Sequence, residues 1–152
     1  MQFVAVTITN VYLLDRFLRR AGSSLVTFRY FATRPFSTVQ NHVCTWVIED
    51  RGEVEAYGHL DREGETVWLG IAVTCHVRGK GFGRAMMDRL MASARALGVT
   101  AVRLSVDNAN EVAIRLYERF GFRLLVRGKT SSFFEWRSAS PKGTNHLSGS
   151  TE

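Results

Sequence analysis

The sequence predicts an α+β fold with a mostly antiparallel sheet flanked by helices, and three observations support this. Residues 43–73 contain strand-like segments separated by tight turns, the pattern of an antiparallel meander. Residues 67–97 run from an apolar strand through a glycine-rich basic loop into an amphipathic helix. Residues 122–127 and 132–137 flank a glycine-containing turn, which predicts a hairpin that closes the sheet.

The length and composition indicate one globular domain. At 152 residues the chain can bury roughly two thirds of its unfolded surface without disulfides. We expect the domain to span residues 1–137, and residues 138–152 to form a disordered C-terminal tail because they contain almost no apolar side chains. No apolar run approaches the ~20 residues of a membrane span and the N-terminus lacks a secretory pattern, so we expect no membrane contact and a cytoplasmic location.

The charge of the chain favours an anionic ligand, since the formal net charge is +6 and the isoelectric point is near 9.9. We expect no nucleic-acid partner, because the arginines are scattered and no helix-turn-helix or RNA-binding motif accompanies them. A polyphosphate cofactor explains the cations at residues 78–84 better. Cys44 and Cys75 show neither a disulfide framework nor metal-ligand spacing, which predicts buried free thiols and no metal site.

Periodicity and turn residues place the individual elements. Strands are expected at residues 2–9, 43–49, 54–60, 67–73 and 101–106, with turns at 50–53 and 61–65. Helices are expected at residues 12–20, from the glycine loop to residue 97, and at residues 110–120. Asn10 can cap the first helix, and the three helices end at Gly22, Gly98 and Gly121.

Residues 23–42 have the weakest pattern and are expected to contain a second short helix. Aromatic residues are mixed with arginines here, and aromatic faces and guanidinium groups together bind rings, carboxylates and phosphates. Arg29 and Tyr30 are therefore candidate substrate-binding residues. The alternative is that the aromatic side chains fill the core while the arginines face water. These aromatic residues are Phe28, Phe31 and Phe36.

A candidate anion site lies in the run RGKGFG at residues 78–83, between a strand and a helix. The first N–H groups of a helix have no intrahelical partner and lie at the positive end of its dipole. Glycines let a phosphate approach this backbone, and Arg78, Lys80 and Arg84 add positive charge. The spacing fits neither the P-loop nor the dinucleotide fingerprint. The alternative is an ordinary strand-to-helix turn whose glycines permit positive φ.

Two motifs in the sequence resemble the GNAT superfamily of N-acetyltransferases. Residues 78–83 match the acetyl-CoA loop (R/Q)-x-x-G-x-(G/A). Residues 108–122, NANEVAIRLYERFGF, match the second motif N-x-x-A-(I/V)-x-L-Y-x-x-x-G-F. The resemblance covers about residues 1–137 and implies a GNAT fold. In that fold the two central strands, here residues 67–73 and 101–106, splay apart around the pantetheine arm of acetyl-CoA.

The resemblance also implies which residues contact acetyl-CoA, the expected co-substrate. In the family, backbone groups of the first splayed strand pair with the pantetheine amides, loop amides hold the pyrophosphate, and an asparagine contacts the cofactor arm. Carried over position by position, these contacts are Ile71, Val73, Arg78, Gly79, Lys80, Gly81, Gly83, Arg84 and Asn110. The family usually has proline two residues after the strand valine, where this chain has Cys75.

The resemblance implies direct transfer of the acetyl group to an amine. Tyr117 matches the family tyrosine that meets the leaving sulfur, and the N–H of Val73 matches the group that stabilises the oxyanion. The central strand contains no carboxylate, so His59 is the candidate base or substrate contact, with Asp61 as the other nearby group. The alternatives are that Tyr117 and His59 are structural residues, or that Cys75 carries the acetyl group covalently.

The acceptor is predicted by class only. Residues 23–42 and the run YGHLD at residues 57–61 resemble GNAT proteins that act on small amines such as amino sugars. Protein N-termini are the alternative acceptor, because residues 113–122 also resemble the ribosomal-protein acetylating branch. A third hypothesis is a non-catalytic module that binds acyl-CoA. The chain is expected to be a monomer or a homodimer.

Overall fold

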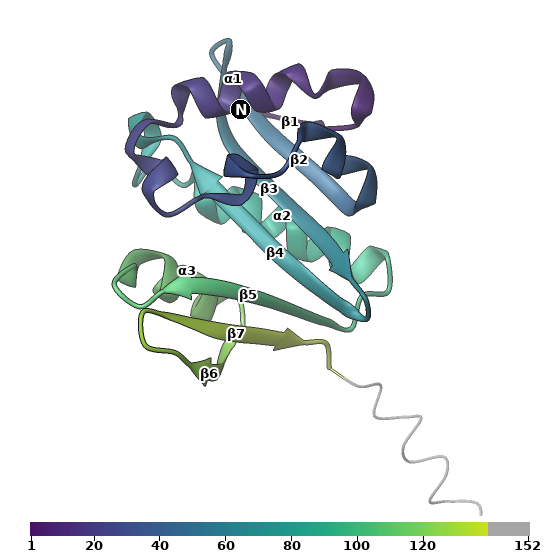
Figure 1. Ribbon diagram of the computed structural model, residues 1–152, viewed down its shortest axis with the longest axis vertical. Helices are drawn as coiled ribbons and strands as arrows, with labels where there is room; N and C mark the ends of the chain where they lie inside the picture. The colour runs from purple at the N-terminus through teal and green to yellow at the C-terminus, as the bar shows by residue number, and fades with distance from the viewer. Residues whose placement is uncertain (140–152) are drawn as a thin grey trace, which may run out of the picture.

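The computed structural model describes residues 1–139, which form a seven-stranded sheet with the order β1-β2-β3-β4-β5-β7-β6. The strands are β1 (Gln2–Ala5), β2 (His42–Asp50), β3 (Glu53–Glu63), β4 (Thr66–Val73), β5 (Ala101–Asp107), β6 (Arg123–Arg127) and β7 (Ser131–Arg137). The helices are α1 (Tyr12–Ala21), α2 (Phe82–Ala96) and α3 (Glu111–Arg119). In Figure 1, α2 crosses behind the sheet, and the chain between α1 and β2 lies in front of it. The predicted α+β fold and its closing hairpin are confirmed.

Strands β4 and β5 join the two halves of the sheet at one register pair, the parallel contact between Trp68 and Arg103. Every other neighbouring pair of strands is antiparallel and extends over several residues. Beyond the contact, β4 and β5 diverge toward their C-terminal ends, as Figure 1 shows. The splayed central strands implied by the family resemblance are therefore confirmed.

Strand β3 is longer than the sequence suggests. The turn expected at residues 61–65 begins only after Glu63, where Gly64 has φ +61°. Asp61 is in the strand, in register with His42 of β2 and Trp68 of β4. The prediction for Asp61 is wrong because a strand between two partners continues as far as its ladders do, whatever the polarity of its residues.

The N-terminal part departs most from the prediction. β1 ends at Ala5, because Thr7 accepts a hydrogen bond from Thr9 N–H and begins a short 3-10 turn. Asn10 does not cap α1; its side chain accepts from Thr7 N–H and donates to the Ala5 carbonyl. The second short helix expected in residues 23–42 is not formed; this segment contains successive 3-10 turns instead. These turns are Gly22–Val26, Tyr30–Ala32 and Phe36–Asn41.

The sheet has a core on each face, and neighbouring residues of β2 point into opposite cores. Ile48 packs in the cluster that contains α2, and Val47 in the cluster that contains α1. Fully burying a large apolar side chain contributes about 1.5–3 kcal/mol, so both helices hold the sheet firmly. In the α1 cluster Phe28 is buried, and Phe31 and Phe36 pack against it. These aromatic residues therefore fill the core, which was the alternative to a substrate-binding role for them.

Three further expectations concern the ends and the thiols of the chain. A disordered tail is expected at residues 138–152, and its part from residue 140 onward lies outside the described residues. Within residues 1–139, no helix combines the length and apolar composition needed to cross a membrane. Cys44 and Cys75 are free, as expected, and partly rather than fully buried.

Candidate active site

Backbone N–H and C=O groups of β4 point into the gap between β4 and β5. Thr74 N–H donates to the Glu55 carbonyl at 2.9 Å, and this bond shows which residues of β4 form hydrogen bonds with β3. In an antiparallel ladder, residues that bond to the partner strand alternate with residues whose N–H and C=O point the other way. Ile71 and Val73 occupy the second kind of position and direct these groups toward the gap. An extended ligand in the gap can pair with them as a strand would.

The turn after α1 packs against this end of β4. Ser24 Oγ donates to the Val73 carbonyl at 2.5 Å. The Arg78 guanidinium donates to Ser23 Oγ at 3.0 Å and to Ser24 Oγ at 3.3 Å. The carbonyl of Val73 therefore has an internal partner, and its N–H is the group left for a ligand in the gap.

The glycine-rich loop delivers an uncapped helix N-terminus beside the gap. Gly79 and Gly81 have φ of +75° and +86°, in the left-handed region that favours glycine. Gly81 is the N-cap of α2, and no side chain of the described part of the chain caps this end. Lys80 and Arg84 are exposed next to it. Backbone N–H groups and two cations therefore converge where the resemblance places the pyrophosphate.

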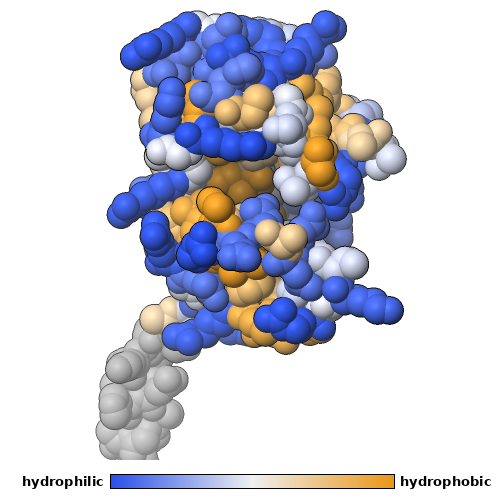
Figure 2. All heavy atoms as spheres, turned by 90° about the vertical axis from the view of Figure 1, so that its left-hand side faces the viewer, coloured by the Kyte–Doolittle hydropathy of each residue, from blue (hydrophilic) through white to orange (hydrophobic). Residues whose placement is uncertain are grey.

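The surface is hollowed on the side toward which β4 and β5 point. Figure 2 shows this side, with an apolar hollow between an upper and a lower band of hydrophilic side chains. The hollow lies where the strands are furthest apart in Figure 1. The gap is therefore reachable from solvent at its wide end.

Helix α3 carries two of the expected site residues. Asn110 is its N-cap: Oδ1 accepts from Ala113 N–H at 3.3 Å, which leaves the amide NH₂ to donate elsewhere. Tyr117 is 7% exposed, and burial raises the pKa of its phenol, which therefore keeps its proton. Among residues 1–139 only Trp46 Nε1 is a buried side-chain polar atom without a hydrogen-bond partner. The Tyr117 hydroxyl, which bonds to no described residue, therefore reaches accessible space.

His59 lies on β3 with its ring above Gly70 of β4. Its Nδ1 is 2.6 Å from the Tyr57 hydroxyl, and the residue is 2% exposed. A Cβ built on Gly70 would lie 2.5 Å from Cε1 and 2.6 Å from Nε2 of the ring. Gly70 therefore makes room for the imidazole, whose Nε2 edge lies above the strand that borders the gap.

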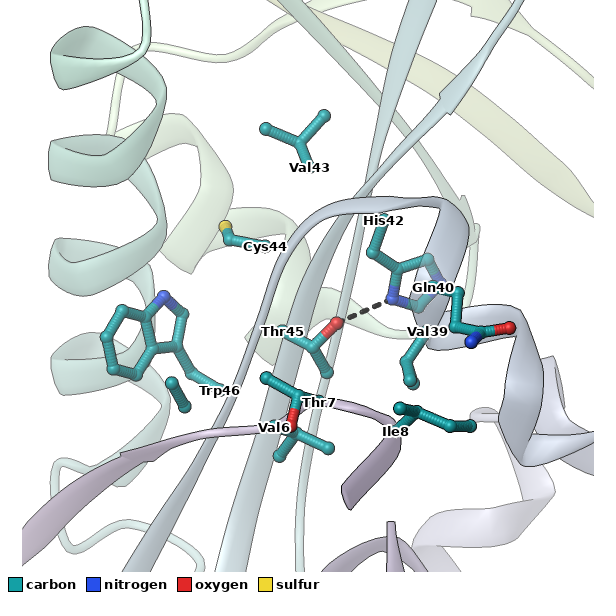
Figure 3. Close-up of a pocket in the computed structure, with 11 residues that line it drawn as sticks. Val6, Thr7, Ile8, Val39, Gln40, His42, Val43, Cys44, Thr45 and Trp46 are labelled. Carbon is teal, nitrogen blue, oxygen red and sulfur yellow. Dashed lines mark hydrogen bonds between the residues drawn. The ribbon is translucent and has the colours of Figure 1, made fainter. Parts of the chain in front are cut away.

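A chain of hydrogen bonds connects Asp61 with a pocket at the β1–β2 edge. The Tyr30 hydroxyl donates to Asp61 Oδ2 at 2.8 Å and is also 2.8 Å from His42 Nε2. His42 Nδ1 is 2.7 Å from Thr45 Oγ1. Both His42 and Thr45 line a pocket of about 440 Å³, where Figure 3 shows their hydrogen bond. The chain thus runs from this pocket to a carboxylate in the interior.

The rings of this cluster are packed together and carry no charge at neutral pH. The ring centroid of His59 is 4.3 Å from that of Tyr30 and 4.6 Å from that of His42. Burial lowers the pKa of His42, and lowers that of His59 well below its ordinary value. Burial raises the pKa of Tyr57 and, together with the hydrogen bond to Asp61, that of Tyr30. Both histidines are therefore neutral and both tyrosines protonated.

Two arginines flank Tyr30. Arg29 forms an ion pair of 3.6 Å with Asp107 at the end of β5, so it ties the segment before β2 to the far side of the gap. The Arg34 guanidinium lies 4.2 Å from the Tyr30 ring centroid and donates to the Tyr30 carbonyl at 3.1 Å. The candidate residues Arg29, Tyr30 and His59 thus lie on the α1 side of the sheet.

Sequence reasoning missed part of this cluster. Tyr57, His59 and Asp61 are spaced by two residues, and this spacing alone places them on one face of a strand. Nothing in the sequence connects His42 or Thr45 to them, because the contact depends on the register between β2 and β3.

Comparisons with known sequences show one family. The model of the Acetyltransferase (GNAT) family matches residues 11–122. A mycothiol acetyltransferase from Propionibacterium freudenreichii subsp. shermanii is 44% identical over 62 residues, which are 41% of this chain and 19% of that protein. A mycothiol acetyltransferase from Thermobispora bispora is 40% identical over 68 residues, 42% of this chain and 23% of that protein. The chain spans about a fifth of the length of these curated relatives.

Solved structures share the fold at low sequence identity. The ribosomal-protein-S18-alanine N-acetyltransferase from Escherichia coli has a TM-score of 0.72 at 20% identity, covering 93% of this chain and 96% of that one. The PaiA N-acetyltransferase from Thermoplasma acidophilum, in complex with coenzyme A, has a TM-score of 0.70 at 12% identity, covering 91% and 100%. The splayed strands and the family match, which includes both the glycine-rich loop and the α3 motif, lead to one conclusion: the chain belongs to the GNAT acetyltransferase family.

Proposed function

We propose that this chain is an acetyl-CoA-dependent N-acetyltransferase that acts on a primary amine by direct attack within a ternary complex. The observation that carries the proposal is the gap between β4 and β5. Amides of Ile71 and Val73 face it, and the uncapped N-terminus of α2 stands beside it. A ligand with amides along an extended arm and a diphosphate at its end matches this combination, and acetyl-CoA is such a ligand.

The remaining cofactor contacts follow from this placement. The diphosphate lies against the N–H groups of residues 79–84, with Arg78, Lys80 and Arg84 supplying positive charge. Gly79 and Gly81 have the positive φ that the loop conformation requires, whereas a Cβ at Gly83 would make an ordinary contact of 3.4 Å with Leu116 of α3. The free amide of Asn110 donates to the cofactor arm.

The chemistry is an acyl transfer in which two protons leave the acceptor nitrogen. An alkylamine with a pKa of about 10.4 arrives mainly as ammonium. After the ammonium has lost one proton to solvent, the neutral nitrogen attacks the thioester carbonyl, the N–C bond forms and an oxyanion develops, which the N–H of Val73 stabilises. Collapse breaks the C–S bond. One proton ends on the CoA sulfur and the other goes to solvent, so the products are an amide, CoA thiol and a proton.

Tyr117 assists the departing sulfur as a hydrogen-bond donor. A phenol is ordinarily a weaker acid than a thiol. Complete transfer of the Tyr117 proton to the thiolate therefore costs about 2 kcal/mol before any effect of the protein environment. Burial raises the pKa of Tyr117 and makes that transfer harder still. Stabilising the thiolate by a hydrogen bond requires no transfer and suits a phenol that stays protonated.

His59 is the proposed base. At neutral pH it is uncharged because burial lowers its pKa, and its Nε2 lies above β4. A base requires the tautomer in which His59 Nδ1–H donates to the Tyr57 oxygen, 2.6 Å away, and the lone pair is on Nε2. The amine loses its basicity as the N–C bond forms, so a weak base suffices at that stage.

The acceptor is proposed to be a small amine that reaches the site past Arg29 and Tyr30. The local identity to enzymes named mycothiol acetyltransferase supports a small-molecule acceptor. A protein N-terminus, as named for the Escherichia coli structure, is the alternative. The same proposal includes a cytoplasmic location for the protein and a monomeric or homodimeric state.

The test is release of CoA thiol from acetyl-CoA by the purified protein, measured with a panel of small amines and with peptides. Thiol release with small amines and not with peptides is the expected result. Preference for peptides would select the protein N-terminal alternative. Tight acetyl-CoA binding by calorimetry without turnover of any amine would indicate the non-catalytic module.

A further inference from the structure

Among the described residues, Asp61 is a buried carboxylate that forms no ion pair with a basic side chain. It is 6% exposed. Glu55, whose side chain is also 6% exposed, is paired with Arg20 at 2.8 Å. Glu135, at 11%, is paired with Arg103 at 2.9 Å. Within residues 1–139 the ion pairs include none with Asp61. Burying a lone negative charge is costly unless hydrogen bonds or a bound cation compensate it.

The hydrogen-bond chain compensates this charge only in part. The single hydroxyl hydrogen of Tyr30 is donated to Asp61, so Tyr30 must accept from Nε2–H of His42. A neutral His42 then accepts at Nδ1 from the hydroxyl of Thr45. Every donor in the chain points toward the carboxylate. The chain therefore orients Asp61 and supports its negative charge without neutralising it.

Asp61 lies on β3, beside the end of the gap at which β4 and β5 meet. It is in register with Trp68, the β4 residue at which β4 and β5 separate. His59, two residues away, is on the same face of β3, with its Nε2 above Gly70. A cation held by Asp61 is therefore adjacent to the proposed base and to the gap.

We propose that Asp61 binds the acceptor in its ammonium form, and that Tyr30, His42 and Thr45 are positioning residues that orient the carboxylate. The inference rests on the proposed function and names its substrate class: primary amines that are cations at neutral pH. Tyr30, expected from the sequence to contact substrate directly, acts here through Asp61. Arg34, stacked on Tyr30, opposes a second positive charge, so a monocation fits better than a polyamine.

The decisive comparison is between charged and uncharged nucleophiles of equal size. The probes are propylamine with O-ethylhydroxylamine, and phenethylamine with O-benzylhydroxylamine; the amines are cations at neutral pH and the aminooxy compounds are not. Asp61→Asn keeps an oxygen that accepts from Tyr30 but removes the charge. Glu63→Gln, an exposed carboxylate on the same strand, is the matched control.

For Asp61→Asn we expect the KM of the amines to rise about tenfold or more and that of the aminooxy compounds to change by less than about threefold. Glu63→Gln should leave both unchanged, and the acetyl-CoA affinity and thermal unfolding of Asp61→Asn should remain close to wild type. Equal losses for the two probe classes, or no loss for the amines, would overturn the proposal.

A binding measurement separates this inference from the proposed function. With CoA bound, propylamine should shift the carboxyl ¹³C resonance of Asp61, and O-ethylhydroxylamine should not. Absence of that shift refutes the ammonium site even if the enzyme is active. A shift without CoA release by wild type refutes the acetyltransferase and leaves the cation site standing.

The positioning residues are tested separately. Tyr30→Phe keeps the ring and should raise the KM of propylamine with little change in kcat, by a smaller factor than Asp61→Asn. The ¹⁵N spectrum of His42 should show the Nε2–H tautomer. The Nδ1–H tautomer, or an imidazolium, would show that the donors do not point toward Asp61.

Discussion

Replacement of Gly70 by alanine tests the packing on which the proposed base depends. The added Cβ would lie 2.5 Å from Cε1 of His59, about 0.9 Å closer than the 3.4 Å at which ordinary contact begins. The ring cannot retreat freely, because Tyr30 and His42 pack against it and Tyr57 holds its Nδ1. Overpacking of this kind costs about 1–3 kcal/mol. At roughly 2–4 °C per kcal/mol, the melting temperature should fall by about 2–12 °C.

The same substitution should lower kcat. General base catalysis contributes about 10²–10⁴-fold, so displacing Nε2 should reduce kcat by at least about tenfold. Gly58→Ala is the matched control, since a Cβ there would lie 2.6 Å from Met86 Sδ in the α2 core. It should destabilise the fold and leave kcat near wild type. Thermal unfolding with thiol-release kinetics on both variants checks this. A Gly70→Ala protein that loses stability but not kcat would refute His59 as the base.

Three further predictions concern other parts of the molecule. Tyr117→Phe should lower kcat about tenfold or more without changing acetyl-CoA affinity, because a hydrogen bond to a charged group contributes about 1.5–3 kcal/mol. Gly81→Ala forces a residue with a Cβ to φ +86°, at a cost of about 1–2 kcal/mol, and should weaken acetyl-CoA binding measured by calorimetry. Gly52→Ala is the control: at φ +82° it carries similar strain, but outside the glycine-rich loop, and should leave acetyl-CoA binding unchanged. The hydrogen bond from Arg20 lowers the pKa of Glu55 in the folded protein below its unfolded value of about 4.3. The stability that the ionised Glu55 provides is therefore fully present above about pH 4.3 and is lost as the pH falls through the folded-state pKa. Glu55→Gln should therefore destabilise the protein in urea at neutral pH and have little effect in strong acid.

Each of these predictions has an outcome that contradicts it. An unchanged rate for Tyr117→Phe removes that phenol from the mechanism. Equal effects of Gly81→Ala and Gly52→Ala on acetyl-CoA affinity would show that the loop amides do not bind the diphosphate. A Glu55→Gln protein that is destabilised equally in acid and at neutral pH would show that the ion pair with Arg20 is not the cause.

The sequence predicted the elements whose signal is local. Apolar residues of α2 recur at helical spacing and are buried as expected, and Gly22 ends α1 with φ +63°. The limits of β3 could not be found this way. Polar residues around Asp61 suggest a turn, but its pairing with His42 and Trp68 keeps it in the sheet. Strand length is decided by partners, which a local pattern does not contain.

The candidate site likewise has one part that a local sequence motif predicts and one part that depends on strand pairing. Residues 78–84 are contiguous, so their motif could be identified from the sequence and the structure gives them the expected strand-to-helix setting. The cluster around Asp61 combines residues from β2, β3 and a 3-10 turn whose contacts follow no period. His42 was therefore absent from the prediction, and Asp61 entered it only as a possible base.

The short pairing of β4 with β5, which has one register pair between Trp68 and Arg103, has a consequence for how the molecule responds to its coenzyme. If the coenzyme arm bonds to β4 as proposed, it acts as an additional strand between β4 and β5, and part of the cohesion between the two half-sheets would come from a diffusible molecule. Saturation at a hundred times the dissociation constant adds about 2.7 kcal/mol to folding stability. In a cell the folding stability of such a protein would then depend on the total concentration of CoA and its thioesters, which share this arm.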